Sequence, residues 1–341
     1  MKRYLIALLC IVFITSNSFA DNSDILIFSG NASPGLAKKI AYELSVPLGK
    51  AIIGKYNDGE INIKIEENVR NKHVFLVQST SKSPGASVND NIMELYLMAR
   101  TLKRSSAKEV TAIIPYYGYA RQDRKTTSRV PISASDVAML LEASGIDRVV
   151  AIDLHCGQIQ GFFHKIPVDN IYASIVATEY FKDRNLQDIV VVSPDAGGVE
   201  RAKKFREQLS KVGVKSDFAV VVKERAGDGV VATANLIGDV KGKTAIIVDD
   251  MCDTGGTLAK AADELKRLGA KTVYASISHP VFSKDAIEKL ERSNFEQVVV
   301  TDSISLPKGN YKKITQLSLA PLLAEVIKNI NTGESVAAVF G

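Results

Sequence analysis

Residues 244–269, TAIIVDDMCDTGGTLAKAADELKRLG, place a short apolar strand directly before two adjacent aspartates. A third acid follows at Asp253, and then the turn Thr254-Gly255-Gly256-Thr257 leads into a helical pattern. A strand over residues 244–248 would deliver Asp249 and Asp250 to its end. This order of strand, polar turn and helix is the unit from which α/β folds are built.

The residue types in this stretch indicate a phosphorylated sugar as the ligand. Adjacent carboxylates accept hydrogen bonds from neighbouring sugar hydroxyls or hold Mg²⁺. Glycines let the backbone approach a ligand closely, and the N-terminus of a helix presents free N–H groups to an anion. The simpler alternative is that Thr257 caps the helix. That alternative does not explain two acids at the end of an apolar strand.

The rest of the chain repeats the same plan. Short apolar runs such as HVFLVQST (73–80) and DIVVVSPD (188–195) alternate with amphipathic helical stretches. These runs are mostly unbroken, as in sheets covered on both faces, and they predict an α/β fold with mostly parallel sheets flanked by helices. The pattern restarts after Pro167. We therefore expect two similar domains, residues 24–167 and 168–320, with a C-terminal helix within 321–341 packing back on the first.

The amino-acid composition limits the classes of molecule that the chain is expected to bind. The 341 residues are 46% hydrophobic and 24% charged, which is typical of globular chains with room for two domains. The formal net charge of +5 is mild, and no block of Lys and Arg interleaved with aromatic residues appears. We therefore expect anionic small molecules and no nucleic acid as partners.

The first twenty residues, MKRYLIALLCIVFITSNSFA, stand apart from the fold. Lys2 and Arg3 precede an apolar run from Tyr4 to Ile14, and small residues end the segment at Ala20. This order is typical of a secretory signal peptide, and the apolar run is too short for an ordinary membrane span. We expect no stable membrane span in the mature chain.

Polar clusters follow the predicted strands directly. They are QSTS (78–81), YARQDRK (119–125), DLH (153–155), SPDAGG (193–198) and DDMCDTGGT (249–257). In open parallel sheets, ligands bind beyond the carboxyl ends of the strands. Five clusters at such ends indicate one extended binding site better than they indicate ordinary solvent-facing loops.

The stretch at 244–257 resembles the phosphoribosyl-diphosphate binding loop of type I phosphoribosyltransferases and of ribose-phosphate diphosphokinases. The N-terminal half separates these families. YNDGE (56–60), IPYYGYARQDRK (114–125) and DLHCGQIQGFF (153–163) are similar to diphosphokinase motifs that a simple transferase does not use. The resemblance runs over residues 24–341 and implies that both domains have the type I phosphoribosyltransferase fold.

The resemblance implies transfer of the diphosphoryl group of ATP to the C1 hydroxyl of ribose 5-phosphate. The products would be AMP and 5-phosphoribosyl 1-diphosphate, a precursor for nucleotide biosynthesis. It assigns the ribose hydroxyls to Asp249 and Asp250. It assigns the 5-phosphate to the turn that follows, namely Asp253, Thr254, Gly255, Gly256 and Thr257.

The same resemblance assigns the ATP side. Arg121 would stack on adenine with Gln122 beside it, while Tyr56, Asp58 and Glu60 would reach the adenine from a neighbouring subunit. A shared ATP site implies a homo-oligomer, commonly a hexamer in this family.

The resemblance also assigns the metal and the catalytic loop. It gives Mg²⁺ to His155 and Asp195, and it gives the catalytic roles to Lys223 and Arg225. The chain departs from the family pattern at Tyr56, where phenylalanine is usual. It departs again after Arg225, where AGDGVVATA (226–234) replaces an Arg- and Pro-rich continuation.

Two other functions stay open: a phosphoribosyltransferase acting on a nucleobase, and a non-catalytic regulatory paralogue. A paralogue of that kind usually loses site residues, and their presence here favours catalysis. The substrates point to the cytoplasm, whereas the signal-like segment 1–20 makes periplasmic export a serious alternative.

Overall fold

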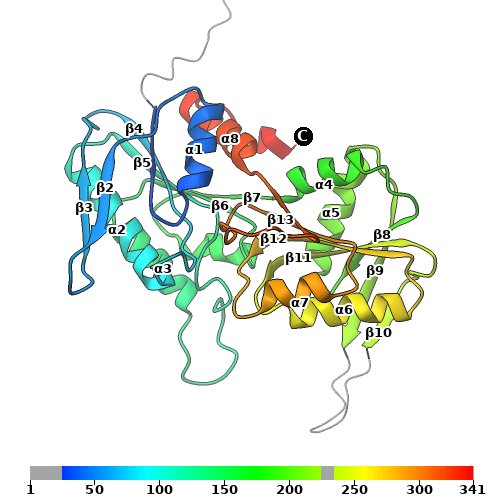
Figure 1. Ribbon diagram of the computed structural model, residues 1–341. Helices are drawn as coiled ribbons and strands as arrows, with labels where there is room; N and C mark the ends of the chain where they lie inside the picture. The colour runs from blue at the N-terminus through cyan, green and yellow to red at the C-terminus, as the bar shows by residue number, and fades with distance from the viewer. Residues whose placement is uncertain (1–24, 224–233, 341) are drawn as a thin grey trace, which may run out of the picture.

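The computed structural model describes residues 25–223 and 234–340, which fold into two lobes with a mostly parallel sheet in each (Figure 1). The first sheet has five strands in the order β1-β4-β5-β6-β7, all parallel. Its strands are β1 (Ile25–Ser29), β4 (His73–Val77), β5 (Glu109–Ile114), β6 (Arg148–Ile152) and β7 (Val168–Ile171). Its helices are α1 (Pro34–Glu43), α2 (Val88–Arg104) and α3 (Ser133–Ala143), with the short 3₁₀ helix η2 (Gly157–Phe162) after β6.

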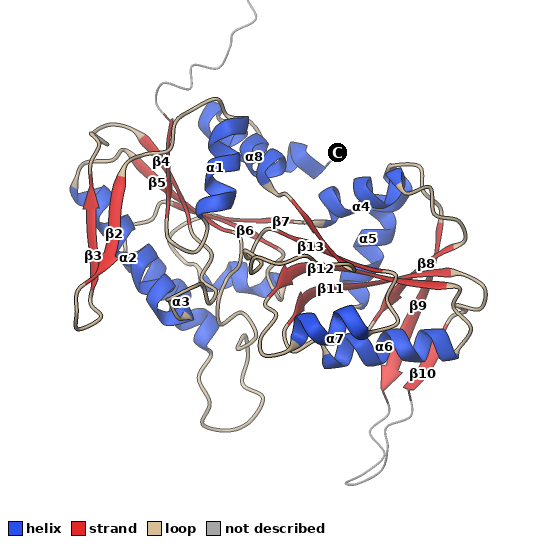
Figure 2. Ribbon diagram, in the orientation of Figure 1, coloured by secondary structure: helices blue, strands red, loops and turns tan. Residues whose placement is uncertain are grey.

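The second sheet has seven strands in the order β10-β9-β8-β11-β12-β13-β14. All neighbours are parallel except β10, which runs antiparallel to β9. The strands are β8 (Ile189–Ser193), β9 (Ser216–Lys223), β10 (Ala234–Ile237), β11 (Thr244–Cys252), β12 (Thr272–Pro280), β13 (Gln297–Thr301) and β14 (Ile314–Leu317). Helices α4 (Ser174–Asp183) and α5 (Val199–Lys211) cover one face, and α6 (Gly256–Arg267) and α7 (Ala286–Arg292) cover the other (Figure 2).

Burial explains the unbroken apolar runs. Every residue of β4 and of β8 is buried, because helices cover both faces of each sheet. The predicted α/β class with mostly parallel sheets flanked by helices is confirmed. Within the described residues, no helix is both long enough and apolar enough to cross a membrane.

The lobes divide slightly later than the sequence predicts. Val168 of β7 pairs with Val149 of β6, so the first sheet extends to Ile171 and the second lobe begins with α4. Pro167 therefore lies in the connection between two neighbouring strands, and the predicted boundary at 168 falls inside the first sheet.

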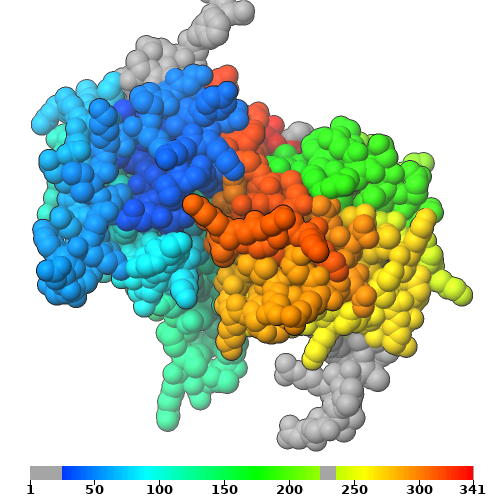
Figure 3. All heavy atoms as spheres, viewed as in Figure 1, coloured from blue at the N-terminus to red at the C-terminus, as the bar shows by residue number. Residues whose placement is uncertain are grey.

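The end of the chain returns to the first lobe. Helix α8 (Ala320–Thr332) and the 3₁₀ helix η3 (Val336–Phe340) share a core with α1, in which Leu323 and Ile327 join Ile27 and Ile40. In Figure 3 this red segment lies on the surface between the blue first lobe and the green part of the second. The last helix thus ties the lobes together, since the chain reaches it only after completing the second sheet.

One element stands away from both sheets. Strands β2 (Ala51–Lys55) and β3 (Ile61–Ile65) form an antiparallel two-stranded ribbon. The ribbon lies at the edge of the first lobe, on the side away from the second lobe (Figure 1).

Candidate active site between the lobes

The two adjacent acids lie within β11. The predicted strand ended at Val248, but β11 continues to Cys252, with Asp249 in register with Ile277 and Met251 with His279 of β12. The extra length arises because β12 also continues to Pro280 and keeps pairing with it. Asp250 is buried, with 2% of its surface exposed, while Asp249 lines a cavity between the lobes.

Arg201 of α5 holds both acids. Its Nη1 lies 3.0 Å from Asp249 Oδ1, and its Nη2 lies 3.2 Å from Asp250 Oδ1. The same Nη2 donates to the main-chain carbonyl of His155 at 3.3 Å. His155 Nδ1 lies 2.7 Å from Asp250 Oδ2. We call these four residues the acid cluster; it joins β11 and α5 of the second lobe to the loop after β6 of the first.

Sequence reasoning did not single out Arg201. It stands inside GGVERA (197–202), in the first turn of the helix that follows the β8 cluster. The usable signal is positional: β8 lies next to β11, so a cation in the first turn of α5 is near the carboxyl end of β11.

The acids of the cluster differ in their protonation. Burial raises the pKa of Asp249, and the neighbouring Asp250 carboxylate raises it further. Burial acts in the same direction on Asp250, but the hydrogen bond from His155 and the charge of Arg201 outweigh it and lower its pKa. The hydrogen bond to Asp250 in turn raises the pKa of His155. The result is an ionised Asp250 that fixes Arg201 and His155 while Asp249 faces the cavity.

The turn after β11 has an unusual backbone. Gly255 has φ +72° and precedes α6, which begins at Gly256. Among the described residues, no side chain caps this helix start, so the structure does not support a capping role for Thr257. The uncapped N–H groups of the first turn are therefore left for an anion.

Gly255→Ala should lower both stability and binding. The added Cβ would lie 3.1 Å from the carbonyl oxygen of Ala286, in a backbone conformation that L residues rarely adopt. We expect the free energy of unfolding to fall by about 1–3 kcal/mol, measured by urea denaturation, with weaker binding of ribose 5-phosphate. Gly256→Ala is the matched control for stability, since its Cβ meets nothing within 4 Å. Equal free energies of unfolding for the two variants would contradict this prediction.

Arg121 and Gln122 lie next to the turn, across the boundary between the lobes. Arg121 Nη1 is 2.8 Å from Asp253 Oδ2, and the Ser283 hydroxyl donates to the other carboxylate oxygen. Arg121 and Gln122 also line a cavity of about 630 Å³ with Tyr116 and Tyr119. The structure thus brings Arg121 together with the predicted phosphate turn, and Gln122 lines the same cavity as Arg121.

His155 and Asp195 follow β6 and β8, but their hydrogen-bond partners differ. His155 contacts Asp250, whereas Asp195 Oδ1 accepts a hydrogen bond from the main-chain N–H of Gly198 at 3.0 Å. Within residues 25–223 and 234–340, no three His, Cys, Asp or Glu side chains gather closely enough to hold a metal. The Asp195 carboxylate is a ligand type that suits Mg²⁺, which commonly binds through one or two carboxylates and completes its shell with water and substrate phosphates.

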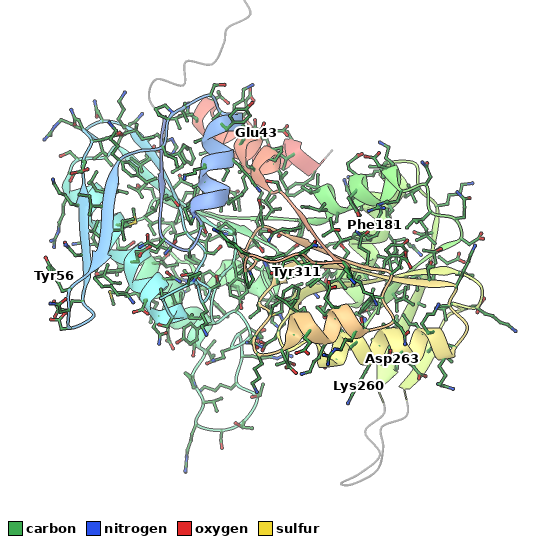
Figure 4. The ribbon with its side chains drawn as sticks, viewed as in Figure 1. Glu43, Tyr56, Phe181, Lys260, Asp263 and Tyr311 are labelled. Carbon is green, nitrogen blue, oxygen red and sulfur yellow. The ribbon has the colours of Figure 1, made fainter. Side chains whose placement is uncertain are left out.

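Three predicted ATP-side residues lie far from the acid cluster in one chain. Tyr56, Asp58 and Glu60 form the tip of the β2–β3 hairpin, and Figure 4 shows Tyr56 at the outer edge of the first lobe. The local geometry is the Asp-Gly hairpin turn that the sequence allowed, with Gly59 at φ +96°. Tyr56 is 56% exposed, so its ring is available to another molecule.

The two predicted catalytic residues, Lys223 and Arg225, lie where the described part of the chain ends after β9. The backbone of Lys223 ends β9 and pairs with Ala234 of β10. Arg225 lies outside the described residues, as does the signal-like segment 1–20.

A cavity of about 650 Å³ opens beside Asp249 and His155. Both lobes contribute to it: Arg124, Cys156 and Gln158 come from the first, and Gly197, Glu200 and Lys204 come from the second. Its lining carries charges of both signs, which suits a polar, hydroxylated ligand better than an apolar one.

Comparisons with known proteins agree with this arrangement. Residues 25–145 match the family model described as the N-terminal domain of ribose phosphate pyrophosphokinase, and residues 230–341 match a phosphoribosyl synthetase-associated domain. The ribose-phosphate pyrophosphokinase of Ralstonia nicotianae is 50% identical over 319 residues, covering 93% of this chain and 98% of that protein. That of Vibrio cholerae is 50% identical over 320 residues, covering 93% and 99%. The crystal structure of phosphoribosylpyrophosphate synthetase from Mycobacterium smegmatis superposes with a TM-score of 0.83 at 40% identity, covering 91% of this chain and 99% of that one.

Proposed function

Because the chain belongs to the ribose-phosphate pyrophosphokinase family, we propose that it transfers the diphosphoryl group of ATP to ribose 5-phosphate. It is a transferase of nucleotide biosynthesis. The oxygen of the C1 hydroxyl attacks the β-phosphorus and loses its proton. The bond between the β-phosphorus and the oxygen that bridges it to the α-phosphorus breaks, and AMP leaves with that oxygen. The observation that carries the proposal is the meeting of the acid cluster, the 253–257 turn and Arg121 at one junction between the lobes.

The second lobe binds the sugar in this proposal. Asp249 and Asp250 accept hydrogen bonds from the ribose hydroxyls, with Arg201 and His155 holding the acids in place. The 5-phosphate lies in the turn from Asp253 to Thr257, where the N–H groups at the start of α6 have no side-chain cap among the described residues.

The first lobe binds the nucleotide in this proposal. Arg121 and Gln122 hold ATP at the cavity they line with Tyr116 and Tyr119. His155 and Asp195 would hold Mg²⁺ together with phosphate oxygens, and the ion would offset the charge of the transferred group. Lys223 and Arg225 would stabilise that charge as cations.

The decisive experiment uses protein that lacks residues 1–20, mixed with Mg²⁺, ATP and ribose 5-phosphate. Ion-exchange chromatography should show AMP and 5-phosphoribosyl 1-diphosphate appearing in equal amounts. Binding of both substrates without product would instead favour the non-catalytic paralogue. Consumption of 5-phosphoribosyl 1-diphosphate with a nucleobase would favour the phosphoribosyltransferase.

We also propose that the ATP site is shared between subunits of a homo-oligomer. The exposed hairpin tip with Tyr56, Asp58 and Glu60 supports this proposal, because in one chain it lies at the edge away from the second lobe. A site completed by a partner subunit explains why a turn so far from the acid cluster carries polar and aromatic groups.

Mixing two inactive variants should restore activity. The first variant carries Tyr56→Ala and Glu60→Ala, and the second carries Asp250→Asn. In a mixed dimer, one of the two sites combines an intact hairpin with an intact acid cluster. Co-expression should therefore give about a quarter of wild-type activity under random pairing. A mixture no more active than its parents would show that each chain supplies its own adenine contacts.

We propose the cytoplasm as the working compartment, because ATP and ribose 5-phosphate are made there. Mass spectrometry of the protein from its host would test this proposal directly. A chain that begins at Asp21 would show that the signal-like segment is cleaved and would favour export.

A further inference from the structure

An ion pair joins the two predicted substrate sites. Arg121 lies on the loop between β5 and α3 of the first lobe, and Asp253 lies on the turn between β11 and α6 of the second. Their side chains meet at 2.8 Å between Nη1 and Oδ2. The contact spans 132 residues of sequence, so the packing of the lobes creates it and no local turn does.

The Asp253 carboxylate is a poor partner for a phosphate. The Ser283 hydrogen bond and the Arg121 guanidinium lower its pKa, so it is ionised at neutral pH. An ionised carboxylate only accepts hydrogen bonds and repels a phosphate dianion. Its two oxygens contact Arg121, through Oδ2, and Ser283, through Oδ1.

The same carboxylate is a good partner for Arg121. The Arg121 side chain is 53% exposed, and a long exposed arginine samples many rotamers unless something holds it. Asp253, anchored by Ser283, fixes the guanidinium at the rim of the cavity lined by Tyr116, Tyr119 and Gln122. A planar cation held in one place binds a nucleotide at a lower entropic cost than a mobile one.

We propose that Asp253 is the positioning residue for Arg121 on the ATP side, and that its carboxylate is not a ligand of the sugar phosphate. The inference rests on the proposed function and refines it at one position. The backbone of the turn, with Thr254 to Thr257, remains the phosphate cradle, while the Asp253 side chain serves the other substrate.

The test separates binding of the two substrates by calorimetry. One titration uses α,β-methylene-ATP with Mg²⁺, an analogue whose α–β linkage cannot break, and the other uses ribose 5-phosphate alone. Asp253→Asn should weaken analogue binding about five- to tenfold and leave ribose 5-phosphate binding unchanged. Arg121→Ala should weaken analogue binding at least as much, and the double variant should be no weaker than Arg121→Ala. Asp263→Asn, on the exposed side of α6, is the matched control.

The opposite pattern would overturn the inference. Loss of ribose 5-phosphate affinity in Asp253→Asn with normal analogue binding would make Asp253 a sugar-phosphate ligand. Additive effects of the two substitutions would show that the residues act separately. If circular dichroism shows that Asp253→Asn does not fold, the same titrations are made with Asp253→Glu. This substitution moves the carboxylate away from its present position and keeps the negative charge.

Neither titration needs turnover, so the test is independent of the activity assay. A wild-type protein that binds the analogue but forms no product would contradict the proposed catalysis and leave this test valid. A wild-type protein that does not bind the analogue would overturn the inference itself.

Discussion

Asp250→Asn is expected to lower kcat/KM for ribose 5-phosphate by about two to three orders of magnitude. Asp250 is 2% exposed, accepts a hydrogen bond from His155 at 2.7 Å, and forms an ion pair with Arg201 at 3.2 Å. Asparagine removes the charge and turns an NH₂ group toward one of these donors. Breaking a buried ion pair on one side costs about 3–5 kcal/mol, because the remaining charge stays without its partner.

The loss should be specific to the acid cluster. Asp263→Asn makes the same chemical change on α6, where the residue is exposed and its carboxylate accepts a hydrogen bond from Asn294 at 2.8 Å. That control should keep wild-type rates of AMP formation. Near-normal activity in Asp250→Asn would mean that the ribose hydroxyls are held elsewhere, and the assignment of the sugar site to β11 would fail.

The sequence predicts the fold class well because the pattern that indicates each strand lies within the strand itself. Unbroken apolar runs such as those of β4 and β8 reflect burial on both faces, which is a property of the strands themselves. The boundary was misplaced at 168 because Pro167 is equally suited to a domain linker and to a connection between neighbouring strands. Only the pairing of Val168 with Val149 decides between the two.

The candidate site was harder to predict, because its contacts are long-range. Asp249 and Asp250 can be recognised in the sequence because they follow an apolar run. Arg201 lies 48 residues from Asp249, in a helical stretch whose sequence pattern does not mark it as part of a site. Neither of the two motifs contains a pattern that predicts the ion pair between Arg121 and Asp253. An aspartate that only bound the phosphate would not need this arginine as a partner. Tyr56 has a ring that is 56% exposed, at a hairpin tip on the edge of the first lobe away from the second.

Arg201→Met should be about as damaging as Asp250→Asn, although no motif marks this residue as part of the site. One guanidinium holds Asp249 at 3.0 Å, Asp250 at 3.2 Å and the His155 carbonyl at 3.3 Å. Methionine keeps much of the side-chain length and removes all three contacts. Two adjacent carboxylates without their cation repel each other, so we expect kcat/KM for ribose 5-phosphate to fall by about 100-fold or more.

Arg201→Lys distinguishes geometry from charge. A lysine ammonium is a single point charge and cannot reproduce the fork that bridges two carboxylates, so most of the activity should remain lost. Arg206→Met, on the exposed side of the same helix, controls for removing an arginine from α5 and should keep wild-type activity. Steady-state AMP formation measures all three variants, with urea denaturation to verify folding. Full activity in Arg201→Lys would show that Arg201 supplies only charge. Full activity in Arg201→Met would show that Arg201 is not part of the site.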